Sequence, residues 1–351
     1  MKSKHSFSNI IQRFDRAIFY NKNFDLKDTI ILAGSPRSGT SWLMEILQVI
    51  PGYTSLFEPL NPLYLPKSFD VGFRSRTYLP PREDWPEGER YLKKILTSRP
   101  LYDDNSIKKG DTKKNLNKII SNYLDQLKPE ILMHHLFGNK LLVKFIRLNR
   151  LLPWVAKRVQ LRSMILIIRH PCAVIDSQLK TGFCGYHPTH PPYQDIYPTR
   201  KNILDEASQI EGLSIKLLDR LKKIETREEI IAASWCLDNY VPLSCPKPYP
   251  WTVVIYEKLM KDGEKEITRL FKEIGEKNIR HSAYRHLKIP VLFQKGESEI
   301  VTKADLQLSK WKKSLSAKQI ERILSIVSAF GLDFYTEDFE PDYQNINIRE
   351  L

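Results

Sequence analysis

Short apolar runs recur along this chain, and most are followed by a stretch in which apolar residues return at helical spacing. Such runs predict buried strands, and the fully apolar run at 164–168 suits the centre of a parallel sheet. The predicted strands cover 30–33, 53–57, 140–147, 164–168 and 251–255. The predicted helices cover 40–50, 151–158, 172–180, 258–274 and 317–330. This alternation predicts an α/β fold, a parallel sheet of about four or five strands with helices on both faces.

Two long segments interrupt the alternation. Residues 61–138 open with many prolines and aromatic residues and are too long for a simple connection between a helix and a strand. Residues 182–250 open with a loop rich in glycine, proline and tyrosine. Helical patterns within the two segments cover 87–97, 115–128, 202–223 and 226–237. We expect one domain over 1–351, with both segments forming helical or irregular lids above the strand ends.

The N-terminal segment 1–28 has the pattern of an amphipathic helix. Apolar residues at helical spacing are accompanied by nearby lysines and arginines. A helix of this kind packs on its own domain or lies on an anionic membrane surface, and both alternatives stay open. No apolar run reaches the ~18–20 residues that span a bilayer, and the segment lacks the apolar centre of a secretion signal. The expected location is cytoplasmic, with peripheral membrane contact as the alternative.

Composition narrows the classes of partner. The chain of 351 residues carries 55 basic and 41 acidic residues, a formal net charge of +14. That charge suits a polyanionic small molecule, an anionic membrane or nucleic acid, or it reflects a scattered basic surface. The four cysteines show neither a CxxC pair nor the spacing of a zinc site, which favours reduced thiols in the cytosol.

The segment between the first predicted strand and helix has the form of a phosphate-binding loop. Compared with G-x-x-x-x-G-K-[ST], it matches at Gly34, Gly39 and Ser41 but has Thr40 in place of the lysine. Its cation, Arg37, lies inside the loop. A strand, a glycine-bearing loop and a helix direct backbone N–H groups toward one anion. The missing lysine argues against hydrolysis of a nucleoside triphosphate.

Polar residues also follow other predicted strands. Glu58 stands before a proline that disfavours the α conformation, so its carboxylate lies at a strand end. The end of the predicted strand 140–147 presents Lys144 and Arg147. Arg169 follows the apolar run, with Ser177 eight residues later in the next helix. In open α/β sheets, ligands gather outside the carboxyl ends of the strands. Taken singly, each residue also fits a role without a ligand: Glu58 as a loop carboxylate, Lys144 and Arg169 as surface charges, and Ser177 as an ordinary helical serine.

Several segments together resemble one known family. The string PRSGTSWL resembles the 5′-phosphosulfate loop of sulfotransferases that use 3′-phosphoadenosine-5′-phosphosulfate (PAPS), and IIRHPCAVIDS resembles their 3′-phosphate segment. YEKLM resembles an element near the adenine, and VTKADLQLSKWKKSL more loosely resembles a late segment that closes over the nucleotide. The resemblance covers 29–60, 140–180 and 251–257 closely and 301–330 loosely, and it implies a P-loop-like sulfotransferase fold. Neither expected lid shows it.

The resemblance implies two grips on the nucleotide. The first would hold the 5′-phosphosulfate, the second the ribose 3′-phosphate, and flanking side chains would bound the adenine or close over it. The implied residues are Arg37, Ser38, Gly39, Thr40 and Ser41 for the first, Arg169 and Ser177 for the second, Trp42 and Tyr256 at the adenine, and Lys310 in the closing segment, where lysines at 303, 310, 312 and 313 surround Trp311.

The resemblance also implies the chemistry. Glu58 matches the base that takes the proton of the acceptor hydroxyl, and Lys144 is expected to stabilise the migrating sulfonate. PAPS is the expected co-substrate and PAP the product, and the acceptor is expected to be a carbohydrate or lipid-linked hydroxyl. No acidic pair suited to Mg²⁺ stands out, so no metal is expected. His187 and His190 make a poor metal site without carboxylate or thiolate partners, and contact with the acceptor is the favoured interpretation.

Two other functions remain open. An atypical P-loop kinase would require Mg²⁺ and ATP, and Thr40 in place of lysine disfavours it. A basic module that binds RNA or a membrane without catalysis would bind in a salt-sensitive way. The aromatic residues gather in loops and at strand ends rather than in a basic strip, so no nucleic-acid partner is expected.

Overall fold

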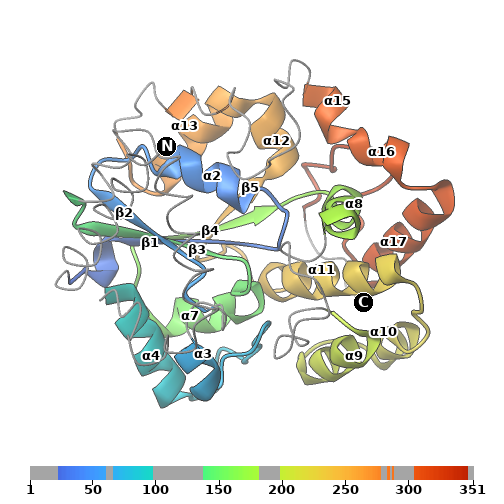
Figure 1. Cartoon of the computed structure of the whole chain (residues 1–351), viewed down its shortest axis with the longest axis horizontal. Helices are drawn as coiled ribbons and strands as arrows, with labels where there is room; N and C mark the ends of the chain where they lie inside the picture. Colours follow the sequence, from blue (N-terminus) through green and yellow to red (C-terminus); the bar gives the residue numbers. More distant parts are fainter. Residues whose placement is uncertain are drawn as a thin grey trace, which may run out of the picture.

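The computed structural model describes residues 23–60, 66–97, 137–181, 198–277, 283–284, 287 and 304–346. Its centre is a sheet of five strands, all parallel, in the order β2-β3-β1-β4-β5 (Figure 1). The strands are β1 (Thr29–Gly34), β2 (Tyr53–Phe57), β3 (Lys140–Phe145), β4 (Ser163–Ile168) and β5 (Thr252–Ile255). The α/β fold class and the five strand positions expected from the sequence are confirmed.

Helices cover both faces of the sheet (Figure 1). The α-helices are α2 (Thr40–Leu47), α3 (Pro66–Asp70), α4 (Pro86–Thr97), α7 (Leu152–Arg158), α8 (Pro171–Thr181), α9 (Arg200–Gln209), α10 (Ile215–Leu221), α11 (Arg227–Leu243), α12 (Tyr256–Lys261), α13 (Gly263–Glu273), α15 (Ala304–Leu308), α16 (Lys310–Ser314) and α17 (Ala317–Ala329). Two short 3-10 helices are η1 (Leu26–Asp28) and η2 (Asn149–Leu151).

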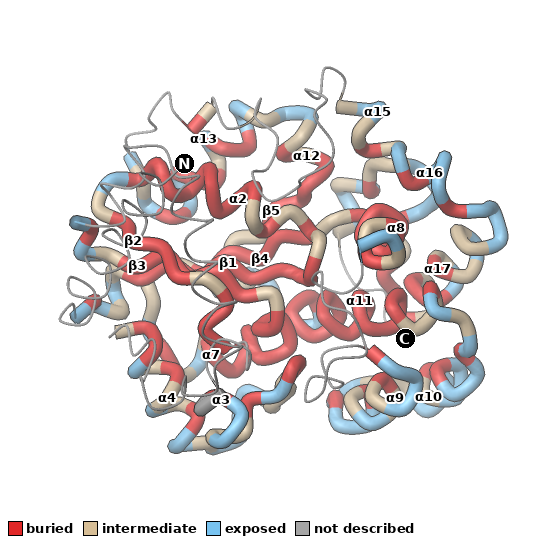
Figure 2. Tube along the Cα trace, viewed as in Figure 1, coloured by how far each residue is buried: buried red, intermediate tan, exposed pale blue. Residues whose placement is uncertain are grey.

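Alternate residues of each strand enter two separate cores. In β1, Ile30 and Leu32 pack with α2, α12 and α13, whereas Ile31 and Ala33 face the core that contains α4, α7 and α11. Successive side chains of a strand point to opposite faces, so a sheet covered on both faces needs apolar residues at every position. The continuous apolar runs in the sequence follow from this double burial, which Figure 2 shows along the central strands.

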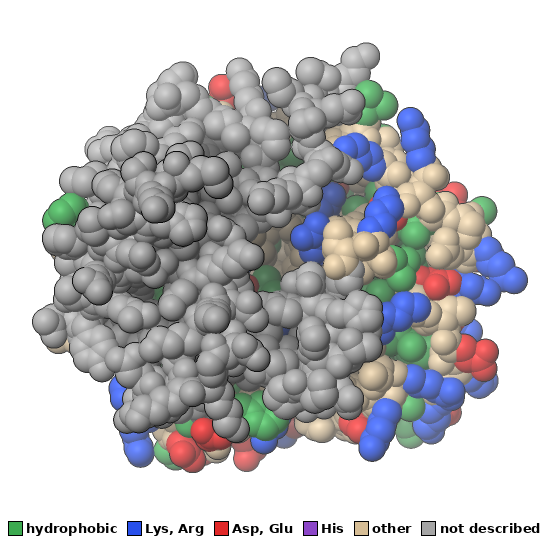
Figure 3. Space-filling model, viewed as in Figure 1, with side chains coloured by type: hydrophobic (Ala, Val, Ile, Leu, Met, Phe, Trp, Pro, Cys, Tyr) green, Lys and Arg blue, Asp and Glu red, His purple; other side chains and the backbone are tan. Residues whose placement is uncertain are grey.

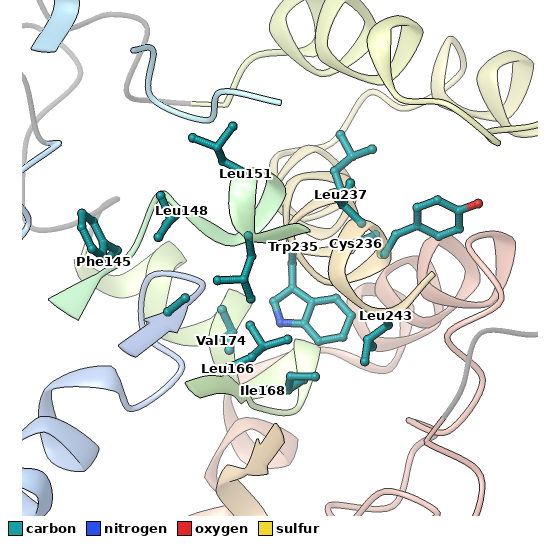
Figure 4. Packing of buried hydrophobic residues seen from close by; sticks show 14 of the residues in the cluster. Phe145, Leu148, Leu151, Leu166, Ile168, Val174, Trp235, Cys236, Leu237 and Leu243 are labelled. Atoms are coloured by element: carbon teal, nitrogen blue, oxygen red, sulfur yellow. The ribbon is translucent and has the colours of Figure 1, made fainter. Parts of the chain in front are cut away.

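Helix α11 is a core element, although it lies inside the segment 182–250 that the sequence suggested as a lid. Most of its residues are buried. Trp235 of α11 packs near Leu166 and Ile168 of β4 and Val174 of α8 (Figure 4). This part of the segment therefore packs within the core. The helix is buried on most sides, and so it differs from a surface helix with a single apolar face.

Two predicted helices are each divided in the structure. The stretch 202–223 forms α9 and α10, because Gly212 adopts a φ of 84° between them and Ser214 caps α10 through a bond from the Leu217 N–H. The stretch 258–274 forms α12 and α13, which are separated at Asp262. The predicted helix at 115–128 and residues 1–22 of the predicted N-terminal helix lie outside the described residues.

The described residues also limit two other expectations. No described helix combines the length and apolar character needed to cross a membrane. The described cysteines, at 172, 236 and 245, are free thiols.

The chain reverses its direction of winding between β1 and β4. Helix α2 joins β1 to β2 across one face of the sheet, and α7 joins β3 to β4 across the other. Since β1 and β4 are neighbours, their carboxyl ends lie side by side while the following segments diverge. Open α/β sheets bind ligands at such a switch point. The loop after β1 and Arg169 after β4 both lie there.

Candidate functional site

The loop after β1 requires glycine at two positions. A Cβ at Gly34 would lie 2.6 Å from Ile167 Cγ2 and 2.7 Å from Thr40 Cγ2. Gly39 has a φ of 91°, and a Cβ there would lie 2.5 Å from Cδ2 of Tyr256. The conformation and the close approach both exclude a side chain at Gly39. The loop backbone at both glycines therefore lies close against β4 and the start of α12.

The same loop presents hydrogen-bond donors to an anion. Helix α2 begins at Thr40 after an N-cap residue, Gly39, that supplies no side-chain cap. The first N–H groups of a helix have no acceptor within it. Ser38 Oγ is buried and has no hydrogen-bond partner in the described part of the chain. Unsatisfied donors at a helix N-terminus fit a phosphate or sulfate group.

Arg37 lies where the two expected grips meet. Its Nε donates to Ser177 Oγ at 2.8 Å, and its carbonyl oxygen accepts from Arg169 Nη1 at 3.1 Å. Gln178 Nε2 donates to the Pro36 carbonyl at 3.0 Å, which fixes the loop to α8. Arg37 adopts a φ of 73°, a conformation that non-glycine residues rarely adopt. Residues far apart in sequence are thus brought together in one cluster of cationic and hydroxyl groups.

Aromatic side chains border this cluster. The Arg169 guanidinium carbon lies 4.2 Å from the ring centroid of Tyr256, and the rings of Tyr256 and Trp42 meet edge to face with centroids 5.3 Å apart. Both rings are largely buried. The arrangement places two aromatic rings beside the cationic cluster, the kind of surroundings in which a base attached to phosphates packs.

Glu58 and Lys144 lie together at the ends of β2 and β3. Lys144 Nζ is 3.7 Å from Glu58 Oε1 and donates to Ser41 Oγ at 3.1 Å. Glu58 Oε2 accepts from the Ile146 N–H at 3.0 Å and lies 3.8 Å from Arg147 Nη1. Glu58 itself has a φ of 45°. Lys144 therefore links the expected base to the phosphate-loop helix.

The surroundings of Glu58 affect its proton affinity in opposite directions. Burial raises the pKa of Glu58, while the charges of Lys144 and Arg147 and the bond from the Ile146 N–H lower it. Burial dominates, so the pKa lies above the ordinary value of a glutamate. A carboxylate with a raised pKa is a stronger base, and a general base needs this property.

The Lys144 ammonium also bears on the choice between kinds of phosphate loop. In nucleoside-triphosphatases, the hydroxyl at the position of Ser41 binds Mg²⁺. Here that hydroxyl oxygen accepts a hydrogen bond from an ammonium group. A second cation beside it would be repelled. Within the described residues, no group of three or more histidine, cysteine or acidic side chains has metal-binding geometry.

Lys310 is more exposed to solvent than the other expected site residues. It is exposed at the start of α16. The contacts that join α16 to the site run through the buried Trp311, whose ring stacks on His170 with centroids 4.6 Å apart, and through Ser314, which donates to Asp176 on α8 at 2.6 Å. Residues 187, 190 and 303 lie outside the described part of the chain.

The sequence did not predict a buried polar cluster behind Arg169. Glu257 accepts from the His170 N–H at 2.9 Å and from the Tyr335 hydroxyl at 3.0 Å. Burial raises the pKa of Glu257 to about 7 and lowers that of His170 to about 3. Neutral His170 accepts from the Cys172 N–H and lies 3.0 Å from the Thr336 carbonyl oxygen. The clue in the sequence was an acidic residue, Glu257, two residues after the end of an apolar strand.

Comparisons with known proteins give structural matches only. No model of a known protein family matches the chain, and no curated protein sequence matches it. The solved structures that match include the sulfotransferase domain from the Synechococcus PCC 7002 olefin synthase, with 16% identity over 88% of this chain and 96% of that chain and a TM-score of 0.42.

Two further matches carry related descriptions. The sulfotransferase domain from the curacin biosynthetic pathway has 16% identity over 85% of this chain and 96% of that chain, with a TM-score of 0.38. Mouse sulfotransferase SULT7A1 complexed with PAP has 13% identity over 91% of this chain and 90% of that chain, with a TM-score of 0.42. At these identities and TM-scores the likeness carries no argument about this chain, whose function has to be inferred from its own residues.

Proposed function

We propose that this protein is a sulfotransferase that moves a sulfuryl group from PAPS to the hydroxyl of an acceptor, a carbohydrate or glycolipid. The observation that carries the proposal is the meeting of Arg37, Arg169 and Ser177 at the carboxyl ends of β1 and β4. Two anion grips set side by side fit a nucleotide with phosphate on both the 3′ and the 5′ position. A loop for a single phosphate would not need the second grip.

The nucleotide would lie between the two grips. Ser38 Oγ, the N–H groups at the start of α2 and Arg37 would hold the 5′-phosphosulfate, and Arg169 with Ser177 would hold the 3′-phosphate. Charge-assisted contacts of this kind contribute about 1.5–3 kcal/mol each. Trp42 and Tyr256 would bound the adenine, and the segment with Lys310 and Trp311 would close over it.

The transfer would proceed as an in-line displacement. Glu58 accepts the proton of the acceptor hydroxyl while the acceptor oxygen forms a bond to sulfur. The bond between sulfur and the 5′-phosphate oxygen breaks, and that oxygen keeps the electron pair and leaves on PAP. Arg37 and Lys144 offset negative charge on the leaving oxygen and on the migrating sulfonate. Positioning and charge stabilisation supply most of the acceleration, as in phosphoryl transfer.

Ligand-induced thermal shifts test the proposal against a kinase. PAP alone should raise the Tm in a saturable manner, whereas ADP or ATP with Mg²⁺ should raise it less at equal concentration, because neither carries a 3′-phosphate. Stabilisation by ATP with Mg²⁺ but not by PAP would favour a kinase. Salt-sensitive RNA binding that PAP leaves unchanged would favour the non-catalytic module.

A further inference from the structure

Arg147, just beyond the end of β3, is a buried cation without its own hydrogen bonds. Its side chain is 2% exposed. In the described part of the chain, none of its three guanidinium nitrogens has a hydrogen-bond partner. The nearest carboxylate is that of Glu58, with 3.8 Å between Nη1 and Oε2. A buried charge left in this state is destabilising, so its retention requires an explanation.

The neighbouring carboxylates are already engaged by other cations. Asp238 accepts from Arg150 Nε at 2.8 Å and lies 3.5 Å from Arg76 Nε, and Glu206 lies 2.6 Å from Arg150 Nη1. Burial lowers the pKa of Arg76, and the nearby charges of Arg150 and Arg147 lower it further. Among the described residues, this region therefore holds four cations, Lys144 included, against the carboxylates of Glu58, Asp238 and Glu206. The excess of positive charge lies beside Glu58.

We propose that Arg147 binds an oxyanion carried by the acceptor, close to the hydroxyl that Glu58 deprotonates. This inference rests on the proposed function and adds the class of substrate to it. A guanidinium presents a planar fork of donors that matches a carboxylate, a sulfate or a phosphate in a bidentate manner. The acceptor is therefore an acidic molecule, such as a uronic acid or a phosphorylated sugar or lipid.

Glu58 and Arg147 would have different roles toward such an acceptor. Glu58 receives the proton, and Arg147 fixes the acidic group so that the hydroxyl lies next to the carboxylate. The anion would satisfy guanidinium donors that the described residues leave unpaired, and it would offset the local excess of cations. Arg147 is thus a residue that determines specificity, and its effect should appear in acceptor binding rather than in PAP binding.

Inorganic phosphate serves as the probe, since the acceptor is not identified. The protein is first saturated with PAP so that the phosphate loop is filled, and the Tm is then followed as phosphate replaces chloride at constant ionic strength. Wild-type protein should show a saturable rise in Tm, and Arg147→Met should show none. Arg147→Lys should retain part of the rise, because lysine binds as a point charge. If Arg147→Met does not fold, the test depends on whether the rise in Tm is smaller in Arg147→Lys than in wild type.

Arg162 supplies the matched control. It lies at the opposite end of the sheet, before β4, and pairs with Glu276 at 2.7 Å. Arg162→Gln should keep the full response to phosphate. The proposal is overturned if wild type shows no saturable rise, or if the rise is the same in the Arg147→Met or Arg147→Lys protein as in wild type.

Failure of this inference can be told apart from failure of the proposed function. If PAP produces no shift, the sulfotransferase proposal fails, and the phosphate titration is repeated in an Arg37→Ala background that weakens the loop. Where PAPS turnover is found, matched acceptors identify the acidic group. If the acidic group is a carboxylate, methyl glucuronide should be sulfated faster than methyl glucoside. If it is a sugar phosphate or a lipid phosphate, glucose 6-phosphate or phosphatidylinositol vesicles should be sulfated faster than methyl glucoside. Equal use of charged and neutral acceptors would contradict an acidic substrate.

Discussion

At the scale of single residues, the site is marked by strained backbone. Among the described residues, the non-glycine positions with positive φ are Arg37 and Glu58. Both are residues to which the proposed mechanism assigns chemistry. Such conformations cost of the order of 1–3 kcal/mol and tend to occur where function requires them. The loop of Arg37 is fixed by its bonds to α8 and β4, and Glu58 is fixed by its bonds to β3.

Replacing the proposed base tests its role directly. Glu58→Gln should lower kcat by about 10²–10⁴-fold, the usual contribution of a general base, and leave the Kd for PAP nearly unchanged. In wild type, kcat/KM should rise with pH as Glu58 loses its proton, over a range above the ordinary pKa of glutamate. The variant should lose this rise.

Arg37→Ala provides the contrast, since it should lower turnover and also weaken PAP binding by about 10–100-fold. Turnover and calorimetric titration of PAP measure both quantities. An equal loss of PAP affinity in the two variants would refute the division of roles.

Gly39→Ala should abolish PAP binding, because the new Cβ would meet the Tyr256 ring at 2.5 Å and push the loop from its place. The matched control is Gly212→Ala. Gly212 also has a positive φ, 84°, but a Cβ there would meet only Tyr240 Oη, at 3.6 Å. Both variants should lose stability from backbone strain, and only Gly39→Ala should lose the thermal shift caused by PAP. A normal PAP response in Gly39→Ala would contradict the contact-based account of the loop.

At the scale of elements, the sequence predicted strands better than it predicted the surroundings of buried charges. Strands that are covered on both faces leave continuous apolar runs, so all five could be found. The burial of helix α11 is harder to predict, because a helix buried on most sides lacks a single apolar stripe. The state of Arg147 could not be read from sequence, because the carboxylate of Asp238, which pairs with Arg76 and Arg150, comes from a distant helix, α11.

The buried pair behind Arg169 should make stability depend on pH in two opposing ways. The pKa of Glu257 rises from 4.5 to about 7 on folding, so the folded state holds the extra proton and its stability falls as pH rises toward 7. The pKa of His170 falls from 6.5 to about 3, so the unfolded state takes up the extra proton and stability falls as pH drops below 6.5.

Glu257→Gln isolates the first effect. As pH rises from 5 to 8, the free energy of unfolding of the variant minus that of wild type should increase. The increase should be roughly 1 kcal/mol for each pH unit below the native pKa of Glu257. Tyr335 and Arg169 also face the carboxyl, and both remain in the variant. Urea unfolding at several pH values measures the difference. A difference that does not change with pH would mean that Glu257 does not bind this proton in the folded state.

At the scale of the whole molecule, the order of the strands positions the proposed site, and the net positive charge favours approach of its proposed ligand. The strand order places the ends of β1 and β4 together at the switch point, where each would contribute one of the two proposed anion grips. Lysine and arginine side chains are spread over the face shown at the right of Figure 3, so the net charge of +14 does not by itself mark the site. It favours approach of a polyanionic nucleotide from many directions.

The central claim is that the two grips hold opposite ends of one nucleotide, and calorimetric titration with PAP and AMP tests it most directly. The two ligands differ only in the 3′-phosphate. Wild type should bind PAP at least 10-fold more tightly than AMP, since one lost charge-assisted contact costs about 1.5–3 kcal/mol. Arg169→Ala should bring the two affinities together. Because Arg169 also donates to the Arg37 carbonyl oxygen, AMP binding should weaken too, but by a smaller factor than PAP binding. An unchanged preference for PAP in Arg169→Ala would contradict the account.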